Sequence, residues 1–507
     1  MANDDGFFVF SGRFDLTQVS KGLKGFSLKI ENSIPRRAFN LLDCYDQSVR
    51  AGGRLLIQTD DVLRLLNSDG SVVEQSGIGT GRFVQDLPEG PVRTALTGFS
   101  SLRALMGITS GWFESHDFAV LDDLQKTQVR GFAQSLSTQG GQVVLVCVQP
   151  MRGYDRAFQT VRAAFADLSS GQQSMEAVFQ ALLPGISPYK AKPDIALGTD
   201  EPSVQVATDI IRTYLHVARQ NEAGVIADID TEFLHDYRVS LRRIRSVLSL
   251  FKGVFSPDQT AEFKQVFSDL MAPTGPVRDM DVYLLDKDMY FSLLPSNLHL
   301  GLEAMFDQFR AERARAFQAL TKQFRSTAYE QQMSKLTTLF SEAGAIQPGP
   351  NAARGAYDYA CALIWKRYRK VCKLARRITE DTPDEAVHAL RIDCKKLRYL
   401  MEFFAPLFDK KAFKVLIKPL KKLQDNLGLF NDYSVQQDAL LGFVSRQSNA
   451  QGRVNAQLAL AAGGLVGILD QRQRAERHRV IASFKHFDSQ DTQHLFCTLF
   501  HHKEVKT

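Results

Sequence analysis

Several kinds of functional site are missing from this sequence. Its six cysteines include no CxxC pair and no spacing typical of a metal site, which favours reduced thiols over a disulfide framework. No run of 18 apolar residues is present, so we expect no membrane-spanning helix. HExxH, GxSxG and EF-hand patterns are absent as well. The first residues, MANDDGFFVFSGRF, lack the basic and apolar segments of a secretory signal, which predicts a cytoplasmic protein.

The sequence also gives little evidence for a glycine-rich phosphate-binding loop. GIGTGR at 77–82 is rich in glycine, as phosphate-binding loops are. No Lys-Ser or Lys-Thr follows it, and the surrounding pattern is not that of a βαβ unit. We therefore interpret this segment as a turn.

Charge is distributed unevenly along the chain. The net charge is +6, yet residues 1–200 carry 19 Lys and Arg against 21 Asp and Glu, so the remainder carries a net charge of +8. With 44% hydrophobic and 23% charged residues, the composition is that of a soluble globular protein with more than one domain. We therefore expect an anionic partner to bind the second part of the chain.

The hydrophobic pattern of the first part is that of strands. Short apolar runs such as GRLLIQTDDVLRLL and GQVVLVCVQP are separated by turn signals, and helical patterns appear only near 91–105 and 154–183. Residues 1–185 are thus predicted to form an α+β domain with an antiparallel sheet or barrel. Residues 186–203 are rich in Pro, Gly and Ser, which is typical of a linker.

Helical periodicity dominates the second part of the chain, and strand-like alternation nearly disappears from it. We predict an all-α domain over 204–487. Its proposed subdivisions are a first unit of about 204–345, a second unit of about 354–487, and a C-terminal tail over 488–507.

One charged pattern occurs twice in the helical part. HDYRVSLRRIRSVLSLFKGVF begins at His235 and matches HALRIDCKKLRYLMEFFAPLF, which begins at His388, an offset of 153 residues. The same offset aligns TGPVRDMDV with LGLFNDYSV some thirty residues later, and with them Gly275 with Gly428 and Asp279 with Asp432. RAERARAF at 310–317 returns as RAERHRVI at 474–481 with a slightly larger offset. Two helical units of roughly 140–150 residues are therefore duplicated.

Each copy of the pattern places its cations on one face of a helix. These two basic stripes are His235, Arg238, Arg242 and Arg245 in the first copy, and His388, Arg391, Lys395 and Arg398 in the second. The opposite faces are apolar: Tyr237, Leu241, Ile244, Leu248 and Phe251, and Leu390, Leu397, Met401 and Phe404. A solvated face normally mixes charges, whereas these stripes contain no acid and their like charges cost helix stability. The pattern therefore favours an anion-binding face.

Further cations accompany the stripes. WKRYRKVCKLARR aligns Lys366, Arg369, Lys370, Lys373 and Arg377, whose counterparts in the first unit are the sparser Arg212, His216 and Arg219. KKAFKVLIKPLKKLQ aligns Lys414, Lys418 and Lys421, where the first unit has Ala261, Gln265 and Ser268. Secondary candidates for anion binding are Arg243, Lys396, Arg313 and Arg477.

The doubled pattern resembles that of the CHAD domain, the conserved histidine α-helical domain. The resemblance covers about residues 204–487 and implies two pseudo-symmetric four-helix bundles with a basic groove between them that binds inorganic polyphosphate. It implies that both basic stripes face the ligand. The histidines would act as conditional donors, so we expect tighter binding as the pH falls from about 8 to 6. Lys395 and Lys396 replace commoner arginines, which should weaken bidentate contacts to phosphate.

CHAD domains often follow a CYTH domain, the tunnel-barrel fold of triphosphatases and class IV adenylyl cyclases. Residues 1–185 resemble a remote and degenerate relative, in which LLDCYDQSVRAGGRLL occupies the place of that family's YFDT…LxxxGxxLR segment. The family's E-x-E-x-K strand is missing, because the early strands are FFVFSGRFDL and FSLKIENS. Without clustered carboxylates to hold metal, we expect an inactive domain with no cofactor.

We interpret the chain as a non-catalytic polyphosphate-binding protein directed to polyphosphate granules. The first alternative is an inorganic triphosphatase or polyphosphatase whose helical part binds the substrate. Nucleic-acid binding is a second alternative, although a helical groove without exposed aromatics offers little for base stacking. Metal chelation by His235 and His388 is disfavoured by the surrounding cations, and we interpret Asp279, Asp281 and Asp432 as helix caps or partners of nearby arginines. A protein partner of the N-terminal domain is left open, and no membrane contact is expected.

Overall fold

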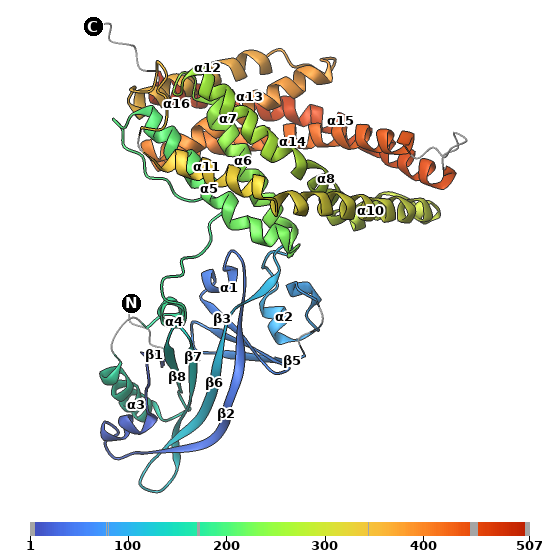
Figure 1. Ribbon diagram of the computed structural model, residues 1–507. Coiled ribbons are helices and arrows are strands. Elements are labelled where there is room, and N and C mark those ends of the chain that lie inside the picture. Colours follow the sequence, from blue (N-terminus) through green and yellow to red (C-terminus); the bar gives the residue numbers. More distant parts are fainter. Residues whose placement is uncertain are drawn as a thin grey trace. The chain divides into compact units, whose positions relative to one another are not determined.

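The computed structural model of the protein describes residues 6–77, 79, 81–169, 173–342, 344–446 and 455–501 (Figure 1). The chain divides into two compact units, Met1–Ala191 and Lys192–Thr507. The glycine-rich segment at 77–82 lies partly outside the described residues, because Ile78 and Thr80 do. The last residues of the predicted tail, 502–507, lie outside them as well.

The first unit is built on an eight-stranded antiparallel sheet with the order β1-β8-β7-β6-β2-β3-β4-β5. Its strands are β1 (Phe7–Ser11), β2 (Ser27–Cys44), β3 (Arg54–Thr59), β4 (Val62–Asn67), β5 (Val72–Ser76), β6 (Leu105–Leu121), β7 (Thr127–Thr138) and β8 (Gln142–Gln149). Its helices are η1 (Leu16–Lys21), α1 (Ser48–Ala51), η2 (Val84–Asp86), α2 (Pro91–Ala95), α3 (Asp155–Leu168) and α4 (Met175–Leu182). The predicted antiparallel sheet domain is confirmed.

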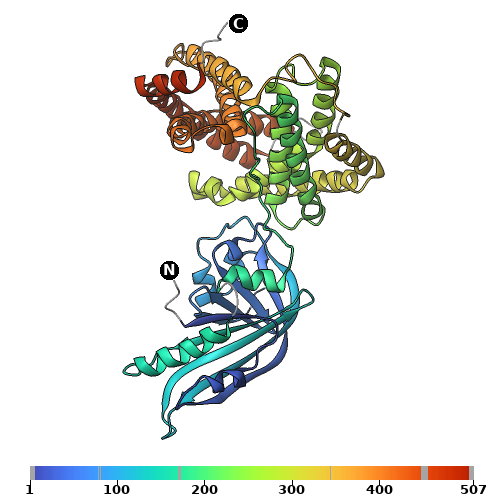
Figure 2. The same cartoon turned by 90° about the vertical axis from the view of Figure 1, so that its left-hand side faces the viewer.

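Helices cover both faces of this sheet. The alternation of side chains along a strand gives each face its own apolar set. On one face, α3 and η1 pack Phe165 and Val19 against Val146 of β8. On the other, α4 packs Phe179 against Leu145 of the same strand. Figure 2 shows the long strands β2, β6 and β7 bending together along the unit.

Two elements of this unit differ from the prediction. The helix expected near 91–105 is confined to α2, because Gly98 and the serines that follow it favour a turn over a continuing helix. The long strand β6 was not predicted, since LMGITSGWFESHDFAVL mixes glycine and polar residues with its apolar ones. Gly111 has a packing role there, because a Cβ atom would lie 1.9 Å from the carbonyl oxygen of Ser137 on β7.

The second unit is helical, as predicted. In the first repeat the elements are α5 (Ser203–Ile226), α6 (Thr231–Leu250), α7 (Pro257–Met271), η3 (Ala272–Thr274), α8 (Gly275–Leu285), α9 (Lys287–Leu293), η4 (Ser296–Leu298), α10 (His299–Phe324) and α11 (Thr327–Ser341). In the second they are α12 (Ala356–Ala375), α13 (Asp384–Phe404), η5 (Ala405–Leu407), α14 (Lys410–Arg446), α15 (Ala456–Phe487) and α16 (Gln490–Phe500). No helix in the described part of the chain is long and apolar enough to cross a membrane.

Equivalent residues of the two repeats meet where α6 and α13 pack. Phe251 and Phe404 are 153 residues apart, and their rings stack with centroids 4.9 Å apart and planes 9° from parallel. A residue that packs on its own equivalent lies at a local two-fold axis. Phe403 and Tyr359 meet the Phe251 ring edge-on, which completes an aromatic cluster at this axis.

A buried ion pair crosses the same contact. Arg243 of α6 is 5% exposed, and its Nη2 donates to Oε2 of Glu402 on α13 over 2.7 Å. The guanidinium also lies 5.2 Å from the ring centroid of Tyr214 and 5.8 Å from that of Tyr399. Glu402 accepts a second bond of 2.6 Å from Arg398 Nε, so one carboxylate holds two arginines. The pKa of Glu402 is lowered by these arginines, although burial opposes them.

The repeats share a second core away from this axis. α14 and α15 pair along their length, and α10 of the first repeat packs beside α15, as Figure 1 shows. Phe306 and Phe309 of α10 belong to one apolar cluster with Leu465 and Leu469 of α15. The elements RAERARAF and RAERHRVI therefore lie on neighbouring helices.

The C-terminal segment differs from the expected tail. Residues 490–500 form α16, which packs on α12 and α14. Its Phe496 stacks on Tyr368 of α12 at 3.8 Å, and Phe500 is 2% exposed. Because these rings are buried, α16 is part of the helical unit.

We predict that Glu402→Gln destabilises the helical unit by about 3 kcal/mol, because it leaves the buried charge of Arg243 without its carboxylate. The measurement is the midpoint of denaturant unfolding, followed by helical circular dichroism. The matched control is Glu262→Gln, which breaks the exposed Lys335–Glu262 pair and should cost less than about 0.5 kcal/mol.

A second variant separates charge from packing in the same experiment. Combining Arg243→Met with Glu402→Gln removes both charges, so the midpoint should return to within about 1.5 kcal/mol of the wild type. Equal midpoints for Glu402→Gln and Glu262→Gln would show that the pair across the axis is unimportant for folding.

Candidate functional site

The basic stripes lie on two well-formed helices. Asp230 caps α6 by accepting hydrogen bonds from the backbone N–H groups of Glu232 and Phe233. Asp384 and Glu385 stand in the first turn of α13, where their charge complements the helix dipole. The predicted apolar faces are buried in both helices, each of their nine side chains being at most 3% exposed. The cationic faces are therefore fixed in direction by the core behind them.

Arg242 shows that the two stripes converge. It lies exposed on α6, one turn from Arg238, and it interacts electrostatically with Arg391 and Lys395 of α13. Burial, and to a smaller degree the Arg242 charge, lowers the pKa of the Arg238 and Arg391 guanidinium groups. Cations from both repeats thus crowd into one region.

Lys395 experiences this crowding most strongly. Its pKa is lowered to about 8, first by burial and then by the charges of Arg391 and Arg242. Asp432 and its 3.6 Å ion pair with Arg391 offset only part of this effect. An anion bound here would relieve the repulsion and raise the pKa of the amine.

Equivalent contacts hold the stripes in both repeats. Arg245 Nη1 lies 3.2 Å from the sulfur of Met271, and Arg398 Nη1 donates to Gln424 Oε1 over 3.0 Å, again at the offset of 153. Arg238 Nη1 donates to Thr274 Oγ1 over 2.5 Å. His388 is exposed and its Nδ1 lies 2.6 Å from Asn431 Oδ1, whereas His235 is half-buried.

A cavity of about 540 Å³ opens between α6, α7 and α13, and we call it the central pocket. Among the residues that the structure describes, its lining contains no carboxylate and five cations, which are Arg242, Arg245, Lys264, Lys395 and Lys396. Tyr399 is its one aromatic residue, and that ring also packs toward Arg243 and Phe403. Ser246, Ser249, Gln265 and Ser268 add neutral hydrogen-bonding groups.

Other predicted cations lie elsewhere on the unit. Lys366, Arg369, Lys370 and Lys373 line a separate concavity between α12 and α16, which shares no lining residue with the central pocket. Arg212 and Arg219 line a third one between α5 and α11. Lys414, Lys418 and Lys421 are exposed along α14, the helix equivalent to α7.

Three secondary candidates instead hold the fold. Arg243 is committed to Glu402, as described above. Arg313 donates from Nε to Asp281 over 2.6 Å and from both Nη atoms to Asp228, so it clamps α8 and α10 beside the start of α6. Arg477 donates hydrogen bonds to the carboxylate of Asp384, the first residue of α13, and to the carbonyl of Thr382, which precedes that helix. These paired arginines have little capacity left for a ligand, whereas Lys396, the equivalent of Arg243, lines the central pocket.

Two cations of this region escaped the sequence analysis. Lys264 of α7 lines the central pocket, and its pKa is lowered by burial and by Lys252. Arg278 of α8 contributes to the electrostatic field at Arg238, and its Nη1 is buried without a hydrogen-bond partner. Both belong to the first repeat alone, since the second has Ile417 and Asn431 at these positions, so the duplication gave no signal.

The acids considered for metal binding are tied to arginines. Asp281 is bonded to Arg313, and Asp432 pairs with Arg391. Burial raises the pKa of Asp279, which Arg238 opposes. Within the part of the chain that the structure describes, no three His, Cys, Asp or Glu side chains gather as a metal site requires.

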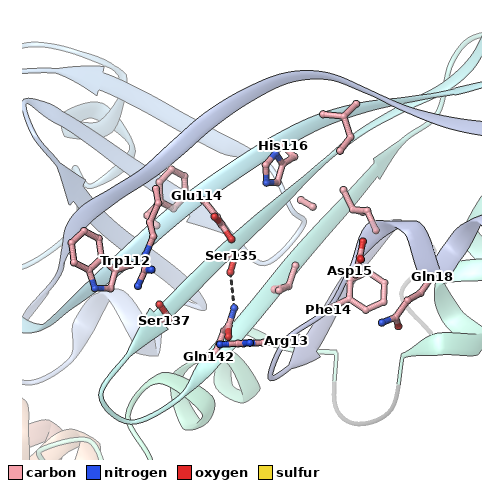
Figure 3. A pocket seen from close by; sticks show the side chains of 16 residues that line it. Arg13, Phe14, Asp15, Gln18, Trp112, Glu114, His116, Ser135, Ser137 and Gln142 are labelled. Carbon is pink, nitrogen blue, oxygen red and sulfur yellow. Dashed lines mark hydrogen bonds between the residues drawn. The ribbon is translucent and has the colours of Figure 1, made fainter.

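The first unit has its own concavity, of about 640 Å³, on the face of the sheet that α3 and η1 cover (Figure 3). Trp112, Glu114 and His116 of β6 line one side, and Arg13 and Asp15 stand opposite them. The wall between is small and polar, with Gln142 Nε2 donating to Ser135 Oγ over 3.1 Å. Of the described residues in this lining, Asp15 and Glu114 are the carboxylates.

Comparison with known proteins finds similarity in the helical unit. The CHAD domain family matches residues 209–441. No curated protein matches the chain. Among solved structures, the crystal structure of the CHAD domain from the plant Ricinus communis is 27% identical, with 59% of this chain and 97% of that one covered and a TM-score of 0.48. PptA from Streptomyces chartreusis is 16% identical, and the match covers 56% of this chain and 100% of that one with a TM-score of 0.45. The family match over residues 209–441 identifies a CHAD domain within the helical unit.

Proposed function

We propose that the helical unit binds inorganic polyphosphate at the central pocket and the stripe residues beside it. One observation carries this proposal: cations from both repeats meet at a pocket whose lining contains no carboxylate. Like charges brought together in this way destabilise the free protein, and a polyanion would neutralise them.

The chemistry of the pocket suits polyphosphate. This polymer carries about one negative charge per phosphate and presents no base edges, so a fixed set of Arg and Lys donors is sufficient. Arg242 and Arg245 can offer paired N–H donors, while Lys395 and Lys396 act as point charges. Tyr399 already packs against Arg243 and Phe403, which leaves little aromatic surface for stacking nucleic-acid bases.

The first test is a titration with polyphosphate across a salt series. Changing Arg238, Arg242, Arg391 and Lys395 to Gln should weaken binding at least about 100-fold, since each removes a charge-assisted contact of more than about 1 kcal/mol. The slope of log K against log salt should fall by about 3, or roughly 0.7 for each lost contact.

The control for that titration changes four cations that are far from the pocket in sequence and exposed, Lys21, Lys24, Lys29 and Arg152, to Gln. It matches the loss of net charge and should leave the affinity within about twofold. Weak binding by the wild type, or equal losses in the two variants, would mean that the stripes are solvated surface. Displacement of polyphosphate by RNA at equal phosphate concentration would favour nucleic-acid binding instead.

Binding should also depend on pH through Lys395. Because its pKa is about 8 in the free protein, the amine is largely neutral at pH 9.5 and charged at pH 7. An anion prefers the charged form, so the affinity should rise at least about threefold as the pH falls across this range. Arginine stays protonated throughout, and Lys395→Arg should flatten the profile. Identical profiles for wild type and variant would remove Lys395 from the site.

We further propose that the N-terminal unit is a degenerate CYTH-like domain without phosphatase activity. Its concavity contains two carboxylates, one of which, Asp15, already caps η1. Metal-assisted phosphoryl chemistry needs a cluster of carboxylates around the metal. The rival hypothesis is an inorganic triphosphatase that receives substrate from the helical unit.

Incubating the full-length protein with tripolyphosphate and magnesium or manganese distinguishes the inactive domain from the triphosphatase. We expect no phosphate release above the background of a matched sample lacking protein. Release that disappears in Glu114→Gln but persists in Glu74→Gln, a change outside the concavity, would establish the triphosphatase.

The cellular role we propose is recruitment of the chain to polyphosphate granules. Binding without turnover suits a protein that must stay on a polymer. In this proposal the N-terminal unit is available to bind a protein partner.

A further inference from the structure

A second basic concavity lies on the outer side of the helical unit, and we call it the outer pocket. It has a volume of about 870 Å³ and lies between α12 and α16. Six cations line it: Lys366, Arg369, Lys370, Lys373, Arg376 and Arg377. Trp365 also belongs to the lining, but its ring packs 4.8 Å from His501 and 5.7 Å from Tyr368, so it forms a wall of the pocket.

Most of this charge has no partner in the fold. Arg376 makes two bonds to Asp488, and Lys370 pairs with Asp393 at 2.9 Å. No carboxylate of the described residues lies within 4 Å of the cationic groups of the other four, which are Lys366, Arg369, Lys373 and Arg377. Lys366, Arg369 and Lys373 are exposed on one face of α12 and Arg377 is exposed just beyond its end, and their mutual repulsion costs stability.

The first repeat shows that the fold does not require this charge. Its equivalent concavity, of about 600 Å³, lies between α5 and α11. Arg212 pairs there with Asp209, Arg219 pairs with Glu330 at 2.8 Å, and hydroxyl groups of α11 complete the lining. The same place in the fold is thus neutralised in one repeat and strongly cationic in the other.

Helix α13 lines the central pocket, and it packs on α12, which lines the outer pocket. Ile392 and Lys396 of α13 line the central pocket, and Asp393 between them bonds Lys370 of the outer pocket. An α-helix with its side chains is about 10 Å across, so a ligand that passes from one pocket to the other crosses α13 and reaches the exposed basic face of α12. A flexible polyanion can cross such a helix.

We propose that the outer pocket is a second polyphosphate site. It binds a further part of the same polyphosphate molecule, which leaves the central pocket and crosses α13. This inference rests on the proposed function and adds a preference for long chains to it. A short chain fills the central pocket alone, whereas a long chain engages both sites. Linking two sites through one ligand raises the affinity without any new contact at the first site.

The test compares tripolyphosphate with a polymer of roughly 100 phosphates, a length ample for bivalent binding. The outer-pocket variant of the full chain changes Lys366, Arg369, Lys373 and Arg377 to Gln. It should lose at least about tenfold in affinity for the long polymer and less than about twofold for tripolyphosphate. The variant of Lys21, Lys24, Lys29 and Arg152 is the control for net charge and should bind both ligands as the wild type does.

The possible failures can be told apart. If the wild type binds neither ligand, the proposed function itself is wrong. If it binds both and the outer-pocket variant binds the long polymer as the wild type does, the outer pocket is not a polyphosphate site. Equal losses for the two lengths would show one continuous site and overturn the bivalent arrangement.

Discussion

The helical unit depends on one contact, in which α6 and α13 pack at a local two-fold axis. Each helix brings a row of cations toward the other, so the contact opposes the electrostatics of the molecule. Packing and an ion pair compensate for this. Phe251 stacks on Phe404 at the axis, and the buried Arg243 reaches across to Glu402. The repulsion therefore remains among half-buried and exposed side chains beside the central pocket.

Cations in this unit perform two different tasks, which burial and pairing distinguish. Arg243, Arg313 and Arg477 are tied to carboxylates at positions where helices begin or cross, and each fixes the geometry of its surroundings. Arg242 and Lys395 have cations as neighbours and remain accessible. The first group gives rigidity and the second gives an electrostatic field of fixed shape. A rigid arrangement of this kind lowers the ordering cost of binding.

Much of this organisation could be predicted from the sequence. The apolar residues at helical spacing, such as Tyr237 and Leu397, are buried, so the direction of the basic stripes follows from periodicity alone. The duplication identified the two equivalent basic helices, but their direct packing on each other was not predicted. The assignment of individual cations was harder, because Arg242 and Arg243 are adjacent in sequence yet one is exposed and the other buried.

Whether such a cation is buried or exposed depends on a partner from a distant part of the chain. Glu402 lies 159 residues from Arg243, and nothing local indicates that the two meet. It also lies four residues after Arg398, so the second stripe does have an acid at its end. Lys264 and Arg278 were missed for the opposite reason, since they lack counterparts in the other repeat. In the N-terminal unit, β6 carries too many polar residues for alternation to reveal a strand paired on both sides.

The stacking of Phe251 on its own equivalent has a consequence for the direction of a bound polymer. A groove related to itself by a two-fold axis presents the same groups to a chain entering from either end. Nucleic acids and peptides have distinct ends, so half of their approaches to such a groove are mismatched. Linear polyphosphate, the ligand that we propose, has identical ends, so both of its orientations would be productive, which is worth about 0.4 kcal/mol as the RT ln 2 of a doubled number of arrangements. The symmetry is broken at several equivalent positions, among them Arg243 and Lys396, Lys264 and Ile417, and Arg278 and Asn431, and it is there that a ligand with two different ends would be read differently in its two orientations.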